Sequence, residues 1–416
     1  MKEGWETEKL IDLGQIQTGT TPSTKNNDYY GDYIPFIKPP NFKKDGTIDY
    51  DDSGLSLKGL EKGRLIKENS VLMVCIGATI GKTGINSIPV SCNQQINAFT
   101  PNPELSPKFF YYLLSSNLFF KKVMKQSSQA TLPMINKTKW QNIEVTYPKS
   151  LHEQKQIVKL LDQAFEAIDQ AKANIEKNIA NAKELFQSKL NEVFSQPVRS
   201  ADGKDEGWEE KTLGEVCYVL NGYAFKSKDA ITESNTQLLR MGNLYKNILD
   251  LDRKPVFYPD SFGEKFKDYL IKEGDLIMSL TGTVDKTDYG YTVKVPEIEV
   301  DLLLNQRIMK IEVHDPKVLN QDYLKNYLLS PGFLTKLYAT SSGTRQANLS
   351  SKTILTLSIN YPKSLSKQNE IVYQLEKLKE YSVHLENEYN QKLTSLEELK
   401  KSILQKAFSG ELTNPN

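Results

Sequence analysis

Two stretches of the chain place apolar residues at alternating steps of four and three, the spacing of a helix with one apolar stripe. One stretch follows Leu151 and the other follows Leu365, and each runs more than 40 residues without Pro or Gly. The second keeps consecutive heptad-like steps through Ser382, Tyr389 and Lys392, which favours a coiled-coil seam over an ordinary core helix. At ~1.5 Å per residue, ~42 residues span roughly 63 Å. The predicted seam residues are Ile157, Leu161, Ile168 and Ile175 in the first helix, and Ile371, Leu375, Leu378, Leu385, Leu396, Leu399 and Ile403 in the second.

The segments that precede these helices have a different pattern. Short apolar runs such as Ser70–Ile76 and Asp275–Leu280 alternate with turns of Gly, Pro and Asn, which predicts strands. A helix-like segment at Pro107–Leu118 has a counterpart near Asp322–Leu329. The chain is therefore predicted to be an α+β protein with two mixed α/β globular parts, each followed by a long helix.

The chain repeats itself, because ordered matches link its two halves. Their offset grows from 203 residues at the start to 214 at the end, so the second globular part holds about eleven extra residues. Self-similarity of this kind is typical of a duplicated structural unit. The matches are Gly4-Trp5-Glu6 with Gly207-Trp208-Glu209, Asn93–Ile96 with Asn305–Ile308, Ser127-Ser128 with Ser341-Ser342, Tyr147–Leu151 with Tyr361–Leu365, Glu184-Leu185 with Glu398-Leu399, and Phe194-Ser195 with Phe408-Ser409.

The repeat predicts four segments. Residues 1–151 and 198–365 are the two globular readers, and residues 152–197 and 366–416 are the two helices. Helices joined in this order can pair antiparallel, with one reader at each end and pseudo-twofold symmetry within one polypeptide. On the repeat alone, a scaffold or adaptor that holds two binding modules apart, without any role on DNA, remains an equal alternative.

Composition narrows the class of protein. Hydrophobic residues make up 38% of the chain and charged residues 25%, no stretch approaches the ~20 apolar residues of a membrane helix, and the first ten residues have no signal-peptide character. Three cysteines without a C-x-x-C pair predict neither disulfides nor a zinc site. A cytoplasmic protein is expected. The net charge is only +1, so DNA binding would need local charge, base contacts or a basic partner.

Several motifs give the whole chain a family resemblance. They are the Gly-Trp start of each half, Ile34–Asn41 (IPFIKPPN), Gly77–Lys82 (GATIGK), Asn93–Ile96 (NQQI), and Tyr147–Leu151 (YPKSL) before a helix that starts with Gln154 and Gln156. In this order, and doubled, they resemble the specificity subunit of type I restriction–modification systems.

The resemblance implies a function without catalysis by this chain. Each reader would be a target recognition domain for one half of a bipartite, asymmetric DNA sequence. The helices would set the spacing of the half-sites and dock two modification (methyltransferase) subunits, which methylate adenine. Restriction/translocase subunits would then join. No cofactor is expected on this chain, whereas the partners would use S-adenosylmethionine, ATP and Mg.

The sequence does not match the motifs of a nucleotide-binding or methyltransferase site. Gly77 and Gly81 are separated by three residues, whereas a phosphate-binding P-loop has four between its glycines. The second copy replaces Gly81 with Asp285. The chain also lacks the glycine-rich cofactor loop and the Asn/Asp-Pro-Pro-aromatic motif of an adenine methyltransferase, and its three histidines stand alone.

Polar loop residues are the candidates for DNA contact. Asn and Gln can bind adenine with two hydrogen bonds, and Arg can bind guanine in the same way. Two alternatives stay open: the Asn-Gln pair caps a turn inside the reader, and the serine-rich loops are merely solvated. The candidates are Lys38, Asn41, Thr79, Lys82, Gln94, Gln95, Ser127 and Gln129 in the first reader, and Arg240, Asn243, Thr283, Lys286, Gln306, Arg307, Arg345 and Gln346 in the second.

Overall fold

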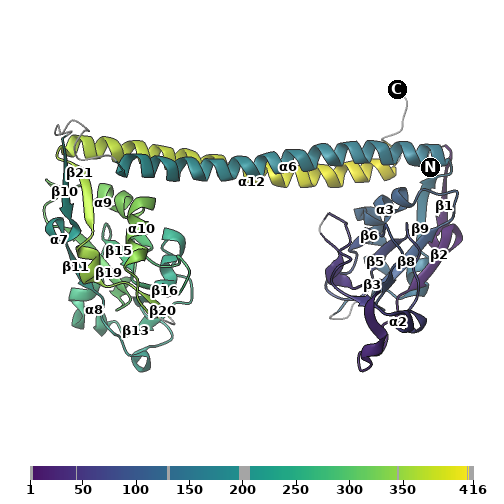
Figure 1. Cartoon of the computed structure of the whole chain (residues 1–416), viewed down its shortest axis with the longest axis horizontal. Helices are drawn as coiled ribbons and strands as arrows, with labels where there is room; N and C mark the ends of the chain where they lie inside the picture. The colour runs from purple at the N-terminus through teal and green to yellow at the C-terminus, as the bar shows by residue number, and fades with distance from the viewer. Residues whose placement is uncertain are drawn as a thin grey trace. The chain divides into compact units, whose positions relative to one another are not determined.

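The computed structural model describes residues 3–43, 45–128, 132–195, 207–343, 346–409 and 411. They form two compact units that interleave along the chain. Unit 1 contains Met1–Glu176 and Asn390–Asn416, and unit 2 contains Lys177–Tyr389. Each unit therefore holds one reader, the first part of the helix that follows it, and the last part of the other helix (Figure 1).

The first reader combines three small sheets. The largest is antiparallel, in the order β2-β8-β5-β6, and a second runs β4-β3-β7, with β3 and β7 parallel. The strands are β1 (Trp5–Lys9), β2 (Gly14–Thr18), β3 (Tyr30–Ile37), β4 (Gly54–Leu55), β5 (Val71–Val74), β6 (Thr83–Ile85), β7 (Ser91–Cys92), β8 (Ile96–Pro101) and β9 (Glu144–Pro148). The helices are α1 (Leu10–Leu13), η1 (Asn27–Tyr29), η2 (Pro39–Asn41), α2 (Leu57–Lys62), α3 (Pro107–Ser115), α4 (Asn117–Gln126) and α5 (Lys137–Gln141).

The second reader repeats this topology. Its main sheet has the order β11-β19-β15-β17, and the parallel pair β12 and β18 corresponds to β3 and β7. The strands are β10 (Trp208–Thr212), β11 (Cys217–Asn221), β12 (Thr236–Leu239), β13 (Phe257–Tyr258), β14 (Leu270–Ile271), β15 (Leu276–Ser279), β16 (Thr281–Thr283), β17 (Thr292–Lys294), β18 (Asp301–Leu304), β19 (Ile308–Val313), β20 (Gln346–Asn348) and β21 (Ser358–Pro362). The helices are α7 (Leu213–Val216), η3 (Ser227–Asp229), η4 (Met241–Asn247), α8 (Ser261–Lys265), η5 (Lys267–Tyr269), α9 (Gln321–Leu328), α10 (Pro331–Ala339) and α11 (Ser351–Leu355).

The first and last strands of each reader pair with each other. Trp5 of β1 lies opposite Pro148 of β9, and Trp208 of β10 lies opposite Pro362 of β21. The repeated Gly-Trp and Tyr-Pro-Lys motifs are therefore the two halves of one antiparallel ladder. Gly4 and Gly207 precede these ladders with φ of 78° and 75°, a conformation that glycine adopts without strain.

Two long helices, α6 (Leu151–Phe194) and α12 (Leu365–Ser409), follow the readers. They begin one residue earlier than the predicted boundaries. In unit 1, Asp169 pairs with Lys400 at 3.4 Å and Lys172 with Glu397 at 3.5 Å. Residue numbers rise on one helix while they fall on the other, so the packing is antiparallel, as predicted. In unit 2, the Ser382 hydroxyl donates to the carbonyl oxygen of Ala182 at 3.1 Å.

The buried face of both helices contains two consecutive steps of four. On α6 the partly or fully buried positions run 168, 171, 175, 179 and 182, and on α12 they run 382, 385, 389, 393 and 396. Each α12 position lies 214 residues after its α6 counterpart, so the repeat duplicates this stutter, which locally unwinds a heptad pattern. Among the seam residues predicted from the sequence, all are buried or half-buried except Leu399.

The stutter corrects two seam predictions. Leu399 is 47% exposed, and Lys392 is also on the exposed face. A heptad pattern continued from Tyr389 predicts Lys392 and Leu399 in the seam. Because a step of four follows Tyr389, Leu393 and Lys400 occupy those seam positions instead, and both are half-buried. The Lys400 side chain contributes its apolar stem there, with its ammonium group 4.7 Å from the centre of the Phe165 ring.

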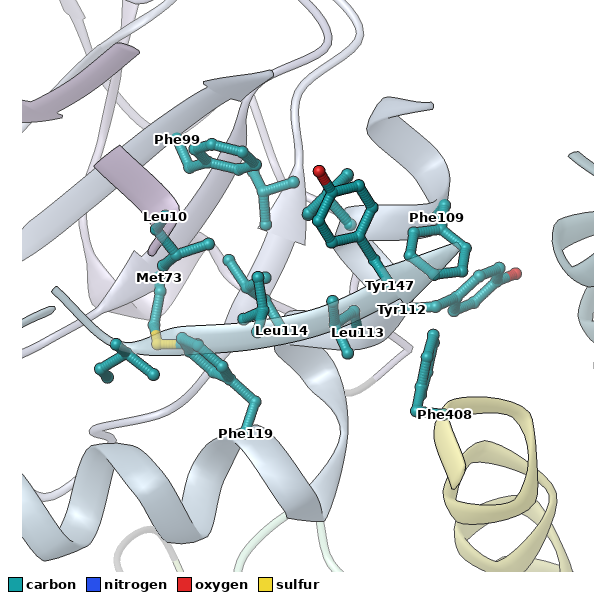
Figure 2. Close-up of a cluster of buried hydrophobic side chains, with 14 of the residues drawn as sticks. Leu10, Met73, Phe99, Phe109, Tyr112, Leu113, Leu114, Phe119, Tyr147 and Phe408 are labelled. Atoms are coloured by element: carbon teal, nitrogen blue, oxygen red, sulfur yellow. The ribbon is translucent and has the colours of Figure 1, made fainter. Parts of the chain in front are cut away.

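Each reader core is completed by the end of the helix from the other repeat. In unit 1, Ala407 and Phe408 of α12 join the core, and the Phe408 ring lies edge-on to Phe109 at 5.4 Å between ring centroids (Figure 2). In unit 2, Phe194 of α6 packs against Tyr323 at 5.3 Å in the same way. Phe194 and Phe408 are repeat equivalents, so this exchange is reciprocal. Among the described residues, no helix combines the length and the hydrophobicity that a membrane span requires.

Candidate nucleic-acid interface

A pair of parallel strands in each reader brings two polar loops to one edge. Ile37 at the end of β3 lies beside Cys92 at the end of β7, and the Asn93 amide donates to the Ile37 carbonyl at 3.0 Å. Lys38 and Asn93 therefore begin neighbouring loops. In the second reader Leu239 and Leu304 are paired in the same manner, and Arg240 and Asn305 begin the corresponding loops.

Three more segments meet this edge in the first reader. The Thr20 amide donates to the Cys92 carbonyl at 2.9 Å, and the Cys75 amide donates to the Gln95 carbonyl at 2.7 Å. The loop after Cys75 is tied through the Gly77 amide to the segment around residue 133, at 3.0 Å. We call these segments the polar edge of the first reader: residues 19–21, 38, 77–79, 93–95, 128 and 132–134.

The second reader has an equivalent polar edge. The Tyr223 amide donates to the Leu304 carbonyl at 2.9 Å, and the Leu280 amide donates to the Arg307 carbonyl at 2.8 Å. Strand β16 then pairs with β20, so Thr283 lies opposite Gln346. This edge comprises residues 222–223, 240, 281–286, 305–307, 342–343 and 346–348.

The sequence did not predict that residues 19–21 and 222–223 belong to the polar edges. A Cβ on Gly19 would lie 2.1 Å from the Asn93 carbonyl oxygen, and a Cβ on Gly222 would lie 2.1 Å from that of Asn305. Only glycine allows the loop to approach so closely. The signal was present in the sequence, because Gly19 and Gly222 share the offset of 203 residues that relates Gly4 to Gly207.

The asparagines at positions 41 and 243 bind the main chain of the turns that begin at Lys38 and Arg240. The Asn41 side chain, 4% exposed, accepts from the Lys38 amide at 2.8 Å, and Asn243, 1% exposed, accepts from the Arg240 amide at the same distance. The Asn243 amide group also donates to the carbonyl of Arg253 at 3.1 Å. Both asparagine side chains are therefore engaged inside the reader, which argues against the direct DNA contact that the sequence predicted.

Ser127 is a second correction. It is 8% exposed, and its hydroxyl donates to the Met124 carbonyl at 2.8 Å at the end of α4. The polar edge instead contains Ser128, whose amide donates to the Met134 carbonyl at 2.9 Å. Two other candidates, Gln129 and Arg345, lie outside the described residues.

In the Asn-Gln motif, the asparagine side chain is buried and the two glutamine side chains are more exposed. Asn93 is 9% exposed and its side-chain oxygen accepts from the Gln95 amide at 3.1 Å, so this asparagine caps the turn. The glutamines are more open: Gln94 is exposed and accepts from the Thr21 hydroxyl, and Gln95 is half-exposed. The cap inside the reader is therefore present at Asn93, while base contact by Gln94 and Gln95 stays a prediction that their exposure permits.

The glycine loop is a hairpin. Residues 75–82 connect β5 to β6, and within this connection Gly77 and Gly81 have φ of 102° and 88°. A P-loop leads from a strand into a helix whose N-terminus faces the phosphate, and here a strand follows. In the second copy, the hydroxyl and amide of Thr283 both donate to Asp288 at 2.7 Å, while Lys286 is exposed.

Lys82 does not join the polar edge. It is exposed and lines a hollow of about 1160 Å³ between the first reader and the helices of unit 1. Tyr111, Phe165 and Lys172 line the same hollow, together with the acidic Asp169. Thr79 is half-buried in the hairpin, and its carbonyl accepts from the Lys82 amide at 3.2 Å.

Two kinds of reactive site can be checked among the described residues, metal-binding clusters and activated thiols. No group of three or more His, Cys, Asp or Glu side chains there is placed to hold a metal ion. Burial raises the pKa of the Cys75, Cys92 and Cys217 thiols to about 12, so these thiols stay protonated and weakly nucleophilic at neutral pH.

Comparison with known proteins places this geometry in context. Residues 2–181 and 205–395 each match the family described as type I restriction modification DNA specificity domain, so the family match follows the internal repeat. The HindI specificity subunit of Haemophilus influenzae is 36% identical over 148 residues, which cover 35% of this chain and 32% of that protein. The StySPI specificity subunit of Salmonella potsdam is 26% identical over 430 residues, which cover 99% and 90%.

Solved structures agree on the fold. A chain from a structure on the assembly and conformational transition of the type I R-M system superposes with a TM-score of 0.73, at 18% identity, over 99% of both chains. The HsdS subunit from Thermoanaerobacter tengcongensis gives a TM-score of 0.60 at 18% identity, over 99% of this chain and 98% of that one. With both halves matched and the fold shared throughout, the chain belongs to the type I restriction–modification DNA specificity family.

Proposed function

We propose that this chain is the non-catalytic DNA-recognition subunit of a type I restriction–modification complex. The observation that carries the proposal is the polar edge, built twice on the same scaffold but with different side chains. Lys38 corresponds to Arg240, and Gln95 corresponds to Arg307. Two equivalent backbone edges that carry different side chains suit a bipartite target whose two blocks differ in sequence.

Partners supply the chemistry in this proposal. The two long helices dock two methyltransferase subunits that methylate adenine with S-adenosylmethionine, and restriction/translocase subunits join with ATP and Mg. The complex acts on the DNA of the cytoplasm. The family match, in both halves of the chain, supports this assignment over a DNA-independent adaptor.

Base contacts carry much of the recognition in this proposal. The net charge of +1 leaves little general attraction to phosphates, because each neutralised phosphate needs a cation. Glutamine and arginine side chains at the two edges can instead form paired hydrogen bonds with base edges in the major groove.

Selection from random duplexes tests this function. The chain, assembled with its methyltransferase partners, is incubated with a pool of randomised DNA, and bound molecules are sequenced. We expect two short, unlike blocks around an unread gap of fixed length. A complex that binds all duplexes equally at physiological salt would contradict the proposal and favour the adaptor.

A further inference from the structure

Gln95 and Arg307 occupy the same place in the two readers. The Gln95 amide donates to Asn93 Oδ1 at 3.1 Å, and the Arg307 amide donates to Asn305 Oδ1 at 3.2 Å. The carbonyl of each accepts from the residue that follows β5 or β15, at 2.7 and 2.8 Å. The backbone amide and carbonyl of Gln95 thus make the same hydrogen bonds as those of Arg307. The two side chains therefore start from equivalent backbone positions.

The two side chains present different hydrogen-bonding groups. The Gln95 side-chain oxygen accepts from Asn93 Nδ2 at 3.0 Å, which fixes the orientation of the carboxamide and leaves its NH2 group and one oxygen lone pair for a ligand. Arg307 is exposed, and within the described residues its guanidinium forms no ion pair. A carboxamide matches the N6 and N7 groups of adenine, and a guanidinium matches O6 and N7 of guanine.

Arginine is rare in this chain. Only six of its 53 cationic residues are arginine, and the other 47 are lysine. Lysine suffices for a point charge, whereas the planar fork of arginine is suited to a two-hydrogen-bond contact. The polar edge of the second reader nevertheless includes Arg240 and Arg307, where that of the first has Lys38 and Gln95. The composition of this edge therefore departs from the preference of the chain for lysine.

We propose that positions 95 and 307 set the base pair read at equivalent points of the two half-sites. Gln95 selects an A·T pair in the first half-site, and Arg307 selects a G·C pair in the second. This assignment rests on the proposed function, because it requires both polar edges to lie in the major groove of the target.

Reciprocal substitution tests the assignment. The assembled complex with Gln95→Arg, and separately with Arg307→Gln, is carried through selection from random duplexes. Gln95→Arg is expected to convert one A·T preference of the first block to G·C, and Arg307→Gln to do the reverse in the second. A good two-hydrogen-bond contact corresponds to a preference of about 10- to 100-fold for the right base. All other positions keep their preferences.

A matched control separates added charge from base reading. Gln15 is exposed in the same reader but lies towards the other end of β2, away from Thr20, so Gln15→Arg adds the same charge without changing either block. Thermal unfolding checks that the variants fold, which is expected because neither Gln95 nor Arg307 is buried.

The possible outcomes distinguish this assignment from the function beneath it. If the unsubstituted complex selects no sequence, the proposed function fails. If it selects a bipartite target but both substitutions leave every base preference unchanged, only the assignment of positions 95 and 307 is overturned. An equal loss of affinity for all sequences, with a weaker dependence on salt, would identify phosphate contacts and also overturn it.

Discussion

The side-chain oxygen of Gln154, at the start of α6, accepts a hydrogen bond from the backbone amide of Ser106 at 2.8 Å. The Gln154 amide group donates to the Pro148 carbonyl at 2.9 Å, and the residue is 0% exposed. Gln368 repeats both bonds, accepting from the Asn320 amide at 2.7 Å and donating to the Pro362 carbonyl at 2.8 Å. One buried glutamine thus joins each reader to the helix that follows it.

Removal of this glutamine should destabilise unit 1. Gln154→Leu keeps the volume but leaves the Ser106 amide and the Pro148 carbonyl without this partner, at about 1–3 kcal/mol for each buried group left unsatisfied. The free energy of unfolding, measured with urea, is expected to fall accordingly. The exposed Gln156 provides the control, and an equal loss for Gln156→Leu would contradict this role.

Truncation of Phe408, near the end of α12, should destabilise the first reader. Phe408→Ala removes a buried ring from the unit 1 core, which typically costs about 3–5 kcal/mol. Hydrogen exchange should show the loss of protection in α3, because the Phe408 ring packs on Phe109 there. Leu399→Ala on the exposed face of the same helix should change stability by no more than about 0.5 kcal/mol. Unchanged protection of α3 in Phe408→Ala would disprove the reciprocal core.

Exchange of one reader should change one block of the target. Replacement of residues 1–150 by the reader of another family member leaves the second polar edge and both helices in place. Selection from random duplexes should then return a new first block, with the second block and the gap preserved. A change in both blocks would show that the readers do not act independently.

Lengthening the helix should widen the gap between the blocks. Residues 174–181 read Asn-Ile-Glu-Lys-Asn-Ile-Ala-Asn, a degenerate four-residue repeat, and they contain Ile175 and Ile179 of the stutter. Duplication of Asn174–Lys177 adds about one helical turn, roughly 6 Å, which corresponds to between one and two base pairs at ~3.4 Å each. The unread gap should grow by at least one base pair while both blocks stay the same.

This test needs an assembled complex, because a further step of four strains the packing of the two helices. Binding of the methyltransferase partners is therefore measured first. If an assembled variant kept the original gap, the helices would not set the spacing.

Sequence periodicity was sufficient for the long helices, and duplication was sufficient for the repeated topology. The stutter escaped prediction because extrapolated heptads choose Lys392 and Leu399, while packing selects Leu393 and Lys400. At the polar edges, residue type alone could not separate a buried asparagine from an exposed one. Asn41 and Asn243 fold back onto their own turns, which only three-dimensional burial reveals.

The strand pair that closes each reader has a genetic consequence. Because β1 lies against β9 and β10 against β21, the chain enters and leaves a reader at neighbouring points. The stretch between them behaves as a cassette whose two junctions, Gly-Trp-Glu and Tyr-Pro-Lys-Ser-Leu, are the same in both halves. A gene that acquires a foreign cassette between such junctions replaces one whole reader in one step, without any change to the two long helices.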